Sequence, residues 1–181
     1  MELTGKNALI IAGPDFEDRE LFYPFYRLLE AGATVKIAGL GEKTYKGKFG
    51  IPVEVNGSCE QFVKDGWDAV IIPGGWAPDK IRANQAALDI VRKAAKEGAV
   101  IGAICHAGWV LASADVIRGK TVTSYKNIQD DMTNAGANWV DREVVVDGNI
   151  VTSRTPSDLP AFCRELVNAV KTAKIPAGAK T

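Results

Sequence analysis

The sequence predicts an α/β protein, a three-layer α/β/α sandwich with a mostly parallel central sheet. Short and almost wholly apolar runs recur at residues 7–12, 69–73 and 100–104. Strands that are apolar on both faces are typical of a parallel sheet covered by helices on each side. Segments with helical spacing of apolar residues alternate with these runs, which is the pattern of β-α-β units.

Strands are expected where aliphatic and β-branched residues cluster between glycine or proline turns. Residues 44–55, rich in glycine and β-branched side chains, predict a small antiparallel hairpin. The last two expected strands pair with each other across the turn Asp147-Gly148. In chain order, the strands outside the hairpin are expected at residues 7–12, 34–38, 69–73, 100–104, 121–123, 144–146 and 150–152.

Helices are expected where apolar residues recur at helical spacing between a capping residue and a glycine. Gly32 and Gly98 close the first two long helices, Pro24 perturbs the first, and Ser58 caps a short one. The long helices are expected at residues 17–31, 85–97, from the turn at Cys105 to about 114, and 159–172. The sequence thus predicts a flavodoxin-like sandwich, with a single domain over residues 1–172 and a flexible tail at 173–181.

The composition narrows the class of protein. The formal net charge of zero, with no long run of either sign, argues against nucleic acid or a membrane surface as a partner. Three cysteines lie far apart, which favours reduced thiols in a cytoplasmic protein over a disulfide framework. One histidine and no paired cysteines argue against a structural zinc site, and we expect neither metal nor cofactor.

The strand at 100–104 leads directly into Cys105 and then into a helix of small residues. A thiol at such a strand-to-helix elbow lies beside helix-terminal N–H groups, which lower a thiol pKa and present it to substrate. His106 follows as the sole histidine of the chain, so any imidazole chemistry must use it. Cys59 and Cys163 lie in ordinary helical contexts, and we expect them to be structural. Cys105 is therefore the expected nucleophile.

Two further loops follow strands that end at the same edge of the sheet, where ligands bind in such folds. Gly74 and Gly75 follow the strand at 69–73, so that a backbone N–H there, together with that of His106, would form an oxyanion hole. Glu17 follows the first strand at a helix start. It either interacts with the helix dipole or, if buried, is protonated and donates a hydrogen bond to a thiolate.

Six segments of the chain together form a recognisable pattern: Phe16-Glu17-Asp18, Pro73-Gly74-Gly75 with Ala77-Pro78-Asp79, Ala103-Ile104-Cys105-His106, Thr123-Ser124-Tyr125, residues 130–136 and residues 144–149. This combination resembles the PfpI intracellular protease branch of the ThiJ/PfpI superfamily, from about Lys6 to Val170.

The resemblance implies a homodimer or hexamer whose site is completed across subunits. It implies that Cys105 is the nucleophile, Glu17 a protonated carboxyl touching it, and His106 the paired imidazole. Asp79, reaching in from a neighbouring subunit, would orient that imidazole, and Tyr125 would line the pocket.

The chain departs from the protease pattern in three places. Asp79 stands where the branch commonly has glutamate, and one fewer methylene shortens its reach to His106. Trp76 stands at a substrate-binding position that is often arginine. Ala107-Gly108-Trp109 replaces the usual Gly-Pro after the Cys-His pair.

Three functions are therefore open. The first is an intracellular, stress-protective cysteine peptidase or hydrolase that acts on peptides. The second is a glutathione-independent glyoxalase III or protein deglycase that acts on methylglyoxal, a small dicarbonyl. The third is a redox-sensing stress protein whose cysteine oxidises without turnover.

Overall fold

The computed structural model describes residues 1–173, so the expected tail lies outside the described residues except for Ala173. Its centre is a seven-stranded sheet in which all neighbours are parallel except the first pair. In spatial order the strands are β10 (Val144–Asp147), β11 (Ile150–Ser153), β7 (Val100–Ile104), β6 (Ala69–Ile72), β1 (Asn7–Ile11), β2 (Thr34–Gly39) and β5 (Gly57–Ser58).

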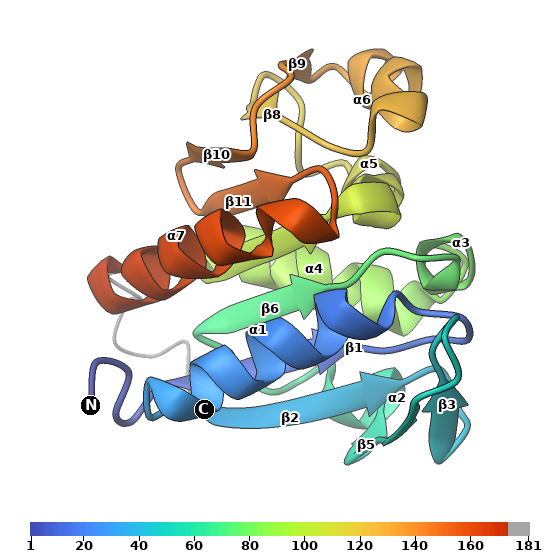
Figure 1. Ribbon diagram of the computed structural model, residues 1–181, viewed down its shortest axis with the longest axis vertical. Helices are drawn as coiled ribbons and strands as arrows, with labels where there is room; N and C mark the ends of the chain where they lie inside the picture. Colours follow the sequence, from blue (N-terminus) through green and yellow to red (C-terminus); the bar gives the residue numbers. More distant parts are fainter. Residues whose placement is uncertain (174–181) are drawn as a thin grey trace.

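Helices cover both faces of this sheet (Figure 1). α1 (Asp18–Glu30) and α7 (Leu159–Thr172) pack together on one face. α2 (Cys59–Phe62), α4 (Gln85–Glu97) and α5 (Gly108–Ala114) cover the other. The predicted three-layer sandwich is thus confirmed.

The local signals in the sequence explain where these helices begin and end. Asn84 caps α4, since its side chain accepts a hydrogen bond from the N–H of Ala87, and Gly98 ends that helix in the left-handed conformation. Ser58 forms a capping box at the start of α2. α1 continues through Pro24 from Asp18 to Glu30.

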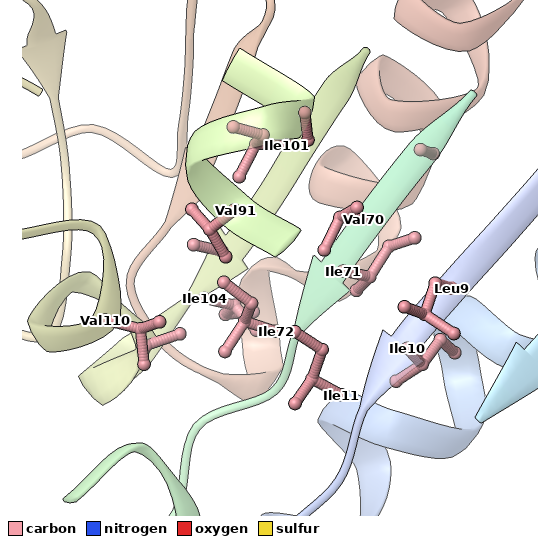
Figure 2. Packing of buried hydrophobic residues seen from close by; sticks show 14 of the residues in the cluster. Leu9, Ile10, Ile11, Val70, Ile71, Ile72, Val91, Ile101, Ile104 and Val110 are labelled. Carbon is pink, nitrogen blue, oxygen red and sulfur yellow. The ribbon is translucent and has the colours of Figure 1, made fainter. Parts of the chain in front are cut away.

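The core lies between the three central strands and the helices. Figure 2 shows aliphatic side chains of β1, β6 and β7 packed with those of α4 and α5. All those labelled there are almost fully buried: Leu9, Ile10, Ile11, Val70, Ile71, Ile72, Val91, Ile101, Ile104 and Val110. This burial explains why these strands are apolar on both faces. The packed strands give a rigid base for the loops that follow their carboxyl ends.

Smaller elements lie outside the sheet. The expected hairpin forms from β3 (Thr44–Lys46) and β4 (Pro52–Glu54). The strand expected near residue 121 is β8 (Thr121–Val122), but it pairs with β9 (Asn138–Trp139) in a separate two-stranded sheet. Two short helices, α3 (Ala77–Ile81) and α6 (Gln129–Asn134), escape sequence-based detection because neither has a full period of apolar residues. In residues 1–173 no helix has the length and apolar character needed to span a bilayer.

Candidate active site

The candidate site is a cavity of about 320 Å³ at the carboxyl ends of β1, β6 and β7. The loops that follow these three strands all contribute side chains or backbone to its wall, as expected for a parallel sheet. The lining groups with acid-base or binding chemistry include Glu17, Glu20, Lys48, Cys105, His106 and Tyr125.

Cys105 occupies a strained elbow. Its φ is +61°, in the left-handed region that non-glycine residues rarely adopt, and a 3₁₀ turn (Cys105–Ala107) follows at once. A Cβ placed on Gly74 would lie 2.7 Å from the Cβ of Cys105, so only glycine fits beneath the elbow. The local fold therefore holds the thiol at the cavity wall with 8% of the residue exposed.

The ionisation of Cys105 differs from the expectation. Burial, and then the charge of Glu20 when that carboxyl is ionised, raise the pKa of the Cys105 thiol to about 12. The backbone N–H groups of His106 and Gly75 bond to the sulfur and lower the pKa, but they do not outweigh burial. The structure thus does not support the predicted low-pKa thiol. The nucleophile must be formed by proton transfer when substrate arrives.

His106 lies where it can accept that proton, since its Nδ1 is 3.3 Å from the Cys105 sulfur. Burial, and then the charge of Lys48, lower the pKa of His106 below its usual 6.5. The imidazole is therefore neutral at pH 7 and has a free acceptor for the thiol proton. The thiol and imidazole form a neutral pair at rest, in place of a preformed ion pair.

Aromatic rings hold the imidazole in place. Tyr125 stacks on His106 with ring centroids 4.8 Å apart, and Trp109 meets it edge-on at 5.1 Å. Trp76 is the third ring beside the imidazole, with a centroid 5.6 Å from that of His106. The structure thus brings Tyr125 and Trp76 to the cavity, as the sequence predicts for both residues.

The carboxyl beside the thiol is Glu20, and the assignment of that role to Glu17 is corrected. One oxygen of Glu17 accepts hydrogen bonds from the Arg19 guanidinium at 2.6 and 2.8 Å, and the other caps α1. Glu17 lines the cavity, but it serves as an ion-paired helix cap. Its charge also acts on Glu20, one turn along the same helix.

Glu20 is fully buried in the first turn of α1. Its Oε2 accepts the N–H of Gly74 at 2.7 Å, while Oε1 has no hydrogen-bond partner among residues 1–173. Burial, and then the charge of Glu17, raise the pKa of Glu20 to about 8, so the group is protonated at pH 7. A protonated Oε1 has a proton to donate to the sulfur or to a substrate oxygen.

The two glycines after β6 have different roles. The N–H of Gly74 is engaged by Glu20, so its predicted part in an oxyanion hole is not supported. The N–H of Gly75 bonds to the Cys105 sulfur, as does that of His106, so this pair is placed to hold an oxyanion. Gly75 has φ +76°, and a Cβ there would collide with the backbone of residues 15–17.

Asp79 lies away from this cavity in its own chain. It is exposed on α3 and forms an ion pair with Lys80 at 2.9 Å. It lines a neighbouring cavity of about 300 Å³ together with Trp76 and Trp109. Within residues 1–173 of one chain, no contact joins Asp79 to His106.

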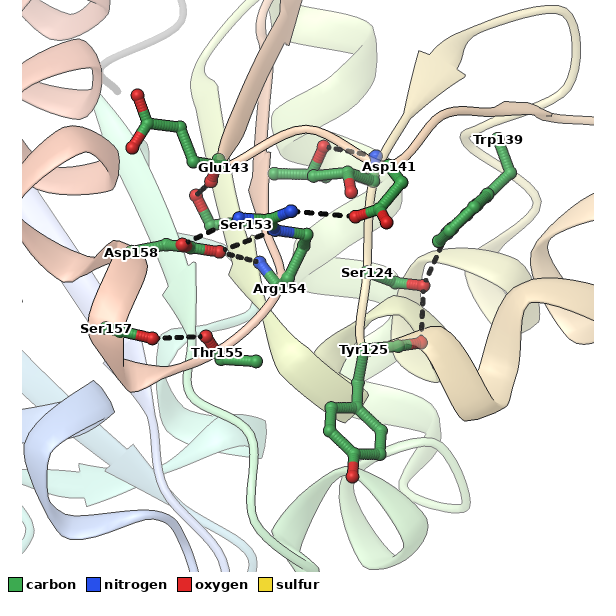
Figure 3. A network of polar contacts seen from close by, with 12 residues as sticks. Ser124, Tyr125, Trp139, Asp141, Glu143, Ser153, Arg154, Thr155, Ser157 and Asp158 are labelled. Carbon is green, nitrogen blue, oxygen red and sulfur yellow. Dashed lines mark hydrogen bonds and ion pairs between the residues drawn. The ribbon is translucent and has the colours of Figure 1, made fainter.

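Sequence reasoning missed two walls of the cavity. One is formed by Thr155 and Pro156 after β11, where Arg154 bonds to both oxygens of Asp158 and to Asp141 (Figure 3). These contacts hold the segment after β11 against the loop before β10 (Figure 3). No motif marks this wall, because its position depends on the pairing of β7 with β11.

The other missed wall is Lys48, in the loop of the β3–β4 hairpin. Asp18, which is buried, accepts the N–H groups of Phe49 at 2.9 Å and Ile51 at 3.1 Å and so fastens this loop over the cavity. Gly47 lies against the Asp18 carboxyl with no room for a Cβ. The sequence gives no local signal for this contact, because Asp18 and the loop N–H groups are 31 and 33 residues apart in the chain.

Replacing Asp18 with alanine is expected to destabilise the protein by about 2 kcal/mol, since two loop N–H groups lose their acceptor. Trypsin should also cleave the hairpin after Lys48 faster than in the wild type. Urea unfolding and limited proteolysis measure the two effects. Asp65→Ala, at an exposed carboxyl, is the control and should change stability by less than about 0.5 kcal/mol. A wild-type unfolding curve for Asp18→Ala would show that the carboxyl does not hold the loop.

The DJ-1/PfpI family profile matches residues 6–169. A deglycase of Pyrococcus abyssi is 47% identical over 163 residues, covering 90% of this chain and 98% of the relative. YraA of Bacillus subtilis, named as a candidate cysteine protease, is 39% identical over 167 residues, covering 92% and 99%.

The similarity extends to solved structures. The crystal structure of DJ-1beta from Drosophila melanogaster superposes with a TM-score of 0.87 at 31% identity, covering 92% of this chain and 90% of that one. The resemblance read from the sequence and the flavodoxin-like fold are both confirmed. Sequence and fold agree over nearly the whole length, and the chain therefore belongs to the DJ-1/PfpI family.

Proposed function

We propose that the chain is a cysteine-dependent enzyme that acts on small reactive carbonyls, a deglycase that releases lactate from methylglyoxal and its early adducts. The observation that carries this proposal is a thiol, a neutral imidazole and a protonated carboxyl around one cavity of about 320 Å³. Such a volume suits a small substrate better than an extended peptide. The 47% identity to a deglycase supports the same reading.

The proposed reaction begins with addition of the Cys105 sulfur to the aldehyde carbon of methylglyoxal. His106 takes the thiol proton and passes it to the aldehyde oxygen, which is held by the N–H groups of Gly75 and His106 and becomes the hydroxyl of a hemithioacetal. In an adduct with an amine, the amine must first leave to expose this carbonyl. The unusual elbow conformation of Cys105 keeps the sulfur at the cavity wall for this attack.

Proton movement completes the reaction. His106 removes the proton from the aldehyde carbon and Glu20 protonates the ketone oxygen, which gives an enediol. His106 then gives its proton to the former ketone carbon while Glu20 takes the proton of the hydroxyl on the sulfur-bearing carbon, which yields a thioester of lactate. Water attacks the thioester, the carbon–sulfur bond breaks, the sulfur regains its proton, and lactate leaves. The aldehyde carbon is oxidised as the ketone carbon is reduced, so no other oxidant or reductant is needed.

Peptide hydrolysis is the second candidate, favoured by the identity to YraA and by the two N–H groups at the sulfur. The two functions separate in one experiment on the reduced protein. A methylglyoxal-treated peptide and the unmodified peptide are supplied in parallel, and lactate, free amine and cleavage products are measured by mass spectrometry. We expect lactate and intact peptide from the first and no cleavage of the second. Cleavage of the unmodified peptide without lactate would overturn the proposal in favour of a peptidase.

We further propose that the protein acts in the cytoplasm, in protection against carbonyl stress, as a homodimer or hexamer. In this assembly Asp79 of one subunit would orient His106 of another. The exposure of Asp79 supports this arrangement, because the carboxylate is available to a second subunit.

Asp79→Ala is expected to lower turnover of methylglyoxal about tenfold, since an imidazole without its orienting carboxylate is a poorer base. The free energy of unfolding should stay within about 0.5 kcal/mol of wild type, because the side chain is exposed. Lactate assays and urea unfolding of Asp79→Ala and Asp65→Ala measure both quantities. Equal rates in the two variants would remove Asp79 from the mechanism.

A further inference from the structure

Among residues 1–173, the cavity is lined by one cation, Lys48, that no carboxylate pairs with. Four charged side chains of the helix start and the hairpin line it: Glu17, Arg19, Glu20 and Lys48. Arg19 and Glu17 neutralise each other in an ion pair of 2.6 Å. Glu20 carries its proton at pH 7, so it adds no charge. In the part of the chain that the structure describes, the Lys48 ammonium has no ion pair or hydrogen bond, and the cavity is left with one positive charge.

The position of Lys48 is fixed by the fold. The neighbouring N–H groups of Phe49 and Ile51 are anchored to the buried Asp18, and the N–H of Lys48 itself donates to the carbonyl of Phe16 at 2.9 Å. Its ammonium lies 5.1 Å from the centre of the Phe49 ring. The backbone is therefore held at Lys48 and at the residues that follow it, and the Lys48 side chain lines the cavity.

The charge of Lys48 reaches the reacting groups. It acts on Cys105, Glu20 and His106, which are the thiol, acid and base of the site. Elsewhere in the wall, Asn127 and Thr155 supply neutral hydrogen-bonding side chains. An anionic group of a small molecule at Cys105 would meet an unpaired cation without facing an unpaired carboxylate.

We propose that Lys48 forms an anion-binding subsite beside Cys105, so that the preferred substrates are 2-oxoaldehydes that carry a carboxylate. The substrate class rests on the proposed function, whereas the subsite itself does not. The probe of this class is 4,5-dioxopentanoate, with an aldehyde, an adjacent ketone and a carboxylate two methylenes away. Its aldehyde carbon would be oxidised and its ketone reduced, with addition of one water, to give 2-hydroxypentanedioate.

The subsite is tested first without turnover, by alkylation of Cys105. Iodoacetate and iodoacetamide attack the same thiolate and differ in charge, so the ratio of their rates cancels any change in the thiol pKa. The quantity compared is the rate with iodoacetate divided by the rate with iodoacetamide, normalised to the same ratio for free cysteine. This ratio should be roughly fivefold higher in the wild type than in Lys48→Met, which is the scale of one exposed charge interaction. Lys48→Arg should retain the high ratio. Lys46→Met, an exposed lysine of the same hairpin, should also retain it.

Mass spectrometry of the peptide that contains Cys105 gives the rates. A Lys48→Met ratio equal to wild type would overturn the subsite, whatever the protein catalyses. An equal fall in Lys46→Met would overturn it too, because the effect would then be general surface charge.

The substrate class is tested next, by comparing kcat/KM for 4,5-dioxopentanoate and methylglyoxal. The wild type should prefer the carboxylated compound, and Lys48→Met should lose roughly fivefold of that preference. An unchanged preference in Lys48→Met would overturn the proposed class. If neither compound turns over while the alkylation ratio still depends on Lys48, the proposed function fails and the anion subsite stands.

Discussion

Cys105→Ser is expected to lower lactate formation from methylglyoxal by at least roughly 10³-fold, because the hydroxyl is a far weaker nucleophile than a thiolate. The replacement is close in size, so the elbow with its φ of +61° and its contact with Gly74 should persist. The loss should therefore appear in kcat, with little change in the urea midpoint. Lactate is measured on reduced protein without added glutathione, so that no external thiol can substitute.

Cys163→Ala is the matched control for the loss of a thiol. Cys163 is buried in α7, and burial raises its pKa to about 12, as it does for Cys105, but it does not line the cavity. Its loss should leave the rate per folded molecule within about twofold of wild type. A Cys105→Ser variant that keeps its activity would show that the elbow thiol is not the nucleophile.

Glu20→Gln is expected to flatten the pH dependence of stability. The pKa of Glu20 is raised from 4.5 to about 8, so between these values the folded state holds a proton that the unfolded chain has released. Stability must then fall as the pH rises through this window, because the native state binds more protons than the unfolded state. The pKa shift corresponds to roughly 4 kcal/mol lost between pH 4.5 and 8.

Glutamine can still accept the N–H of Gly74 and has no proton to release, so Glu20→Gln should lack this loss and be more stable than wild type at pH 8. Urea unfolding at several pH values between 5 and 8 measures the slope. Glu17→Gln keeps Glu20 and removes only the lesser cause of its raised pKa, so the slope should become shallower but remain. A slope in Glu20→Gln that matches wild type would mean that Glu20 does not carry the proton.

Much of the fold could be predicted because it follows from periodicity. The buried strands and long helices appear in the sequence as apolar runs and helical spacing, and the β3–β4 hairpin appears as a glycine-rich stretch. β9 and α6 could not be predicted in this way. They are only 2 and 6 residues long and depend on packing beside β8 and α5.

The candidate site could be predicted in its position and less well in its chemistry. The carboxyl ends of parallel strands meet at one edge, which brings Cys105, His106 and Gly75 together. The choice between Glu17 and Glu20 depends on which side of the first turn of α1 faces the sheet. The pKa of Cys105 depends on burial by distant segments. Neither can be read from neighbours in the chain.

Formation of lactate from methylglyoxal by the reduced wild-type protein, without glutathione, tests the central claim most directly. NMR follows the substrate and lactate together, and catalysis predicts many equivalents of lactate per Cys105. Consumption of methylglyoxal that stops at one equivalent, with no lactate, would contradict the account. It would show that Cys105 is a reactive thiol in a site that does not complete this reaction.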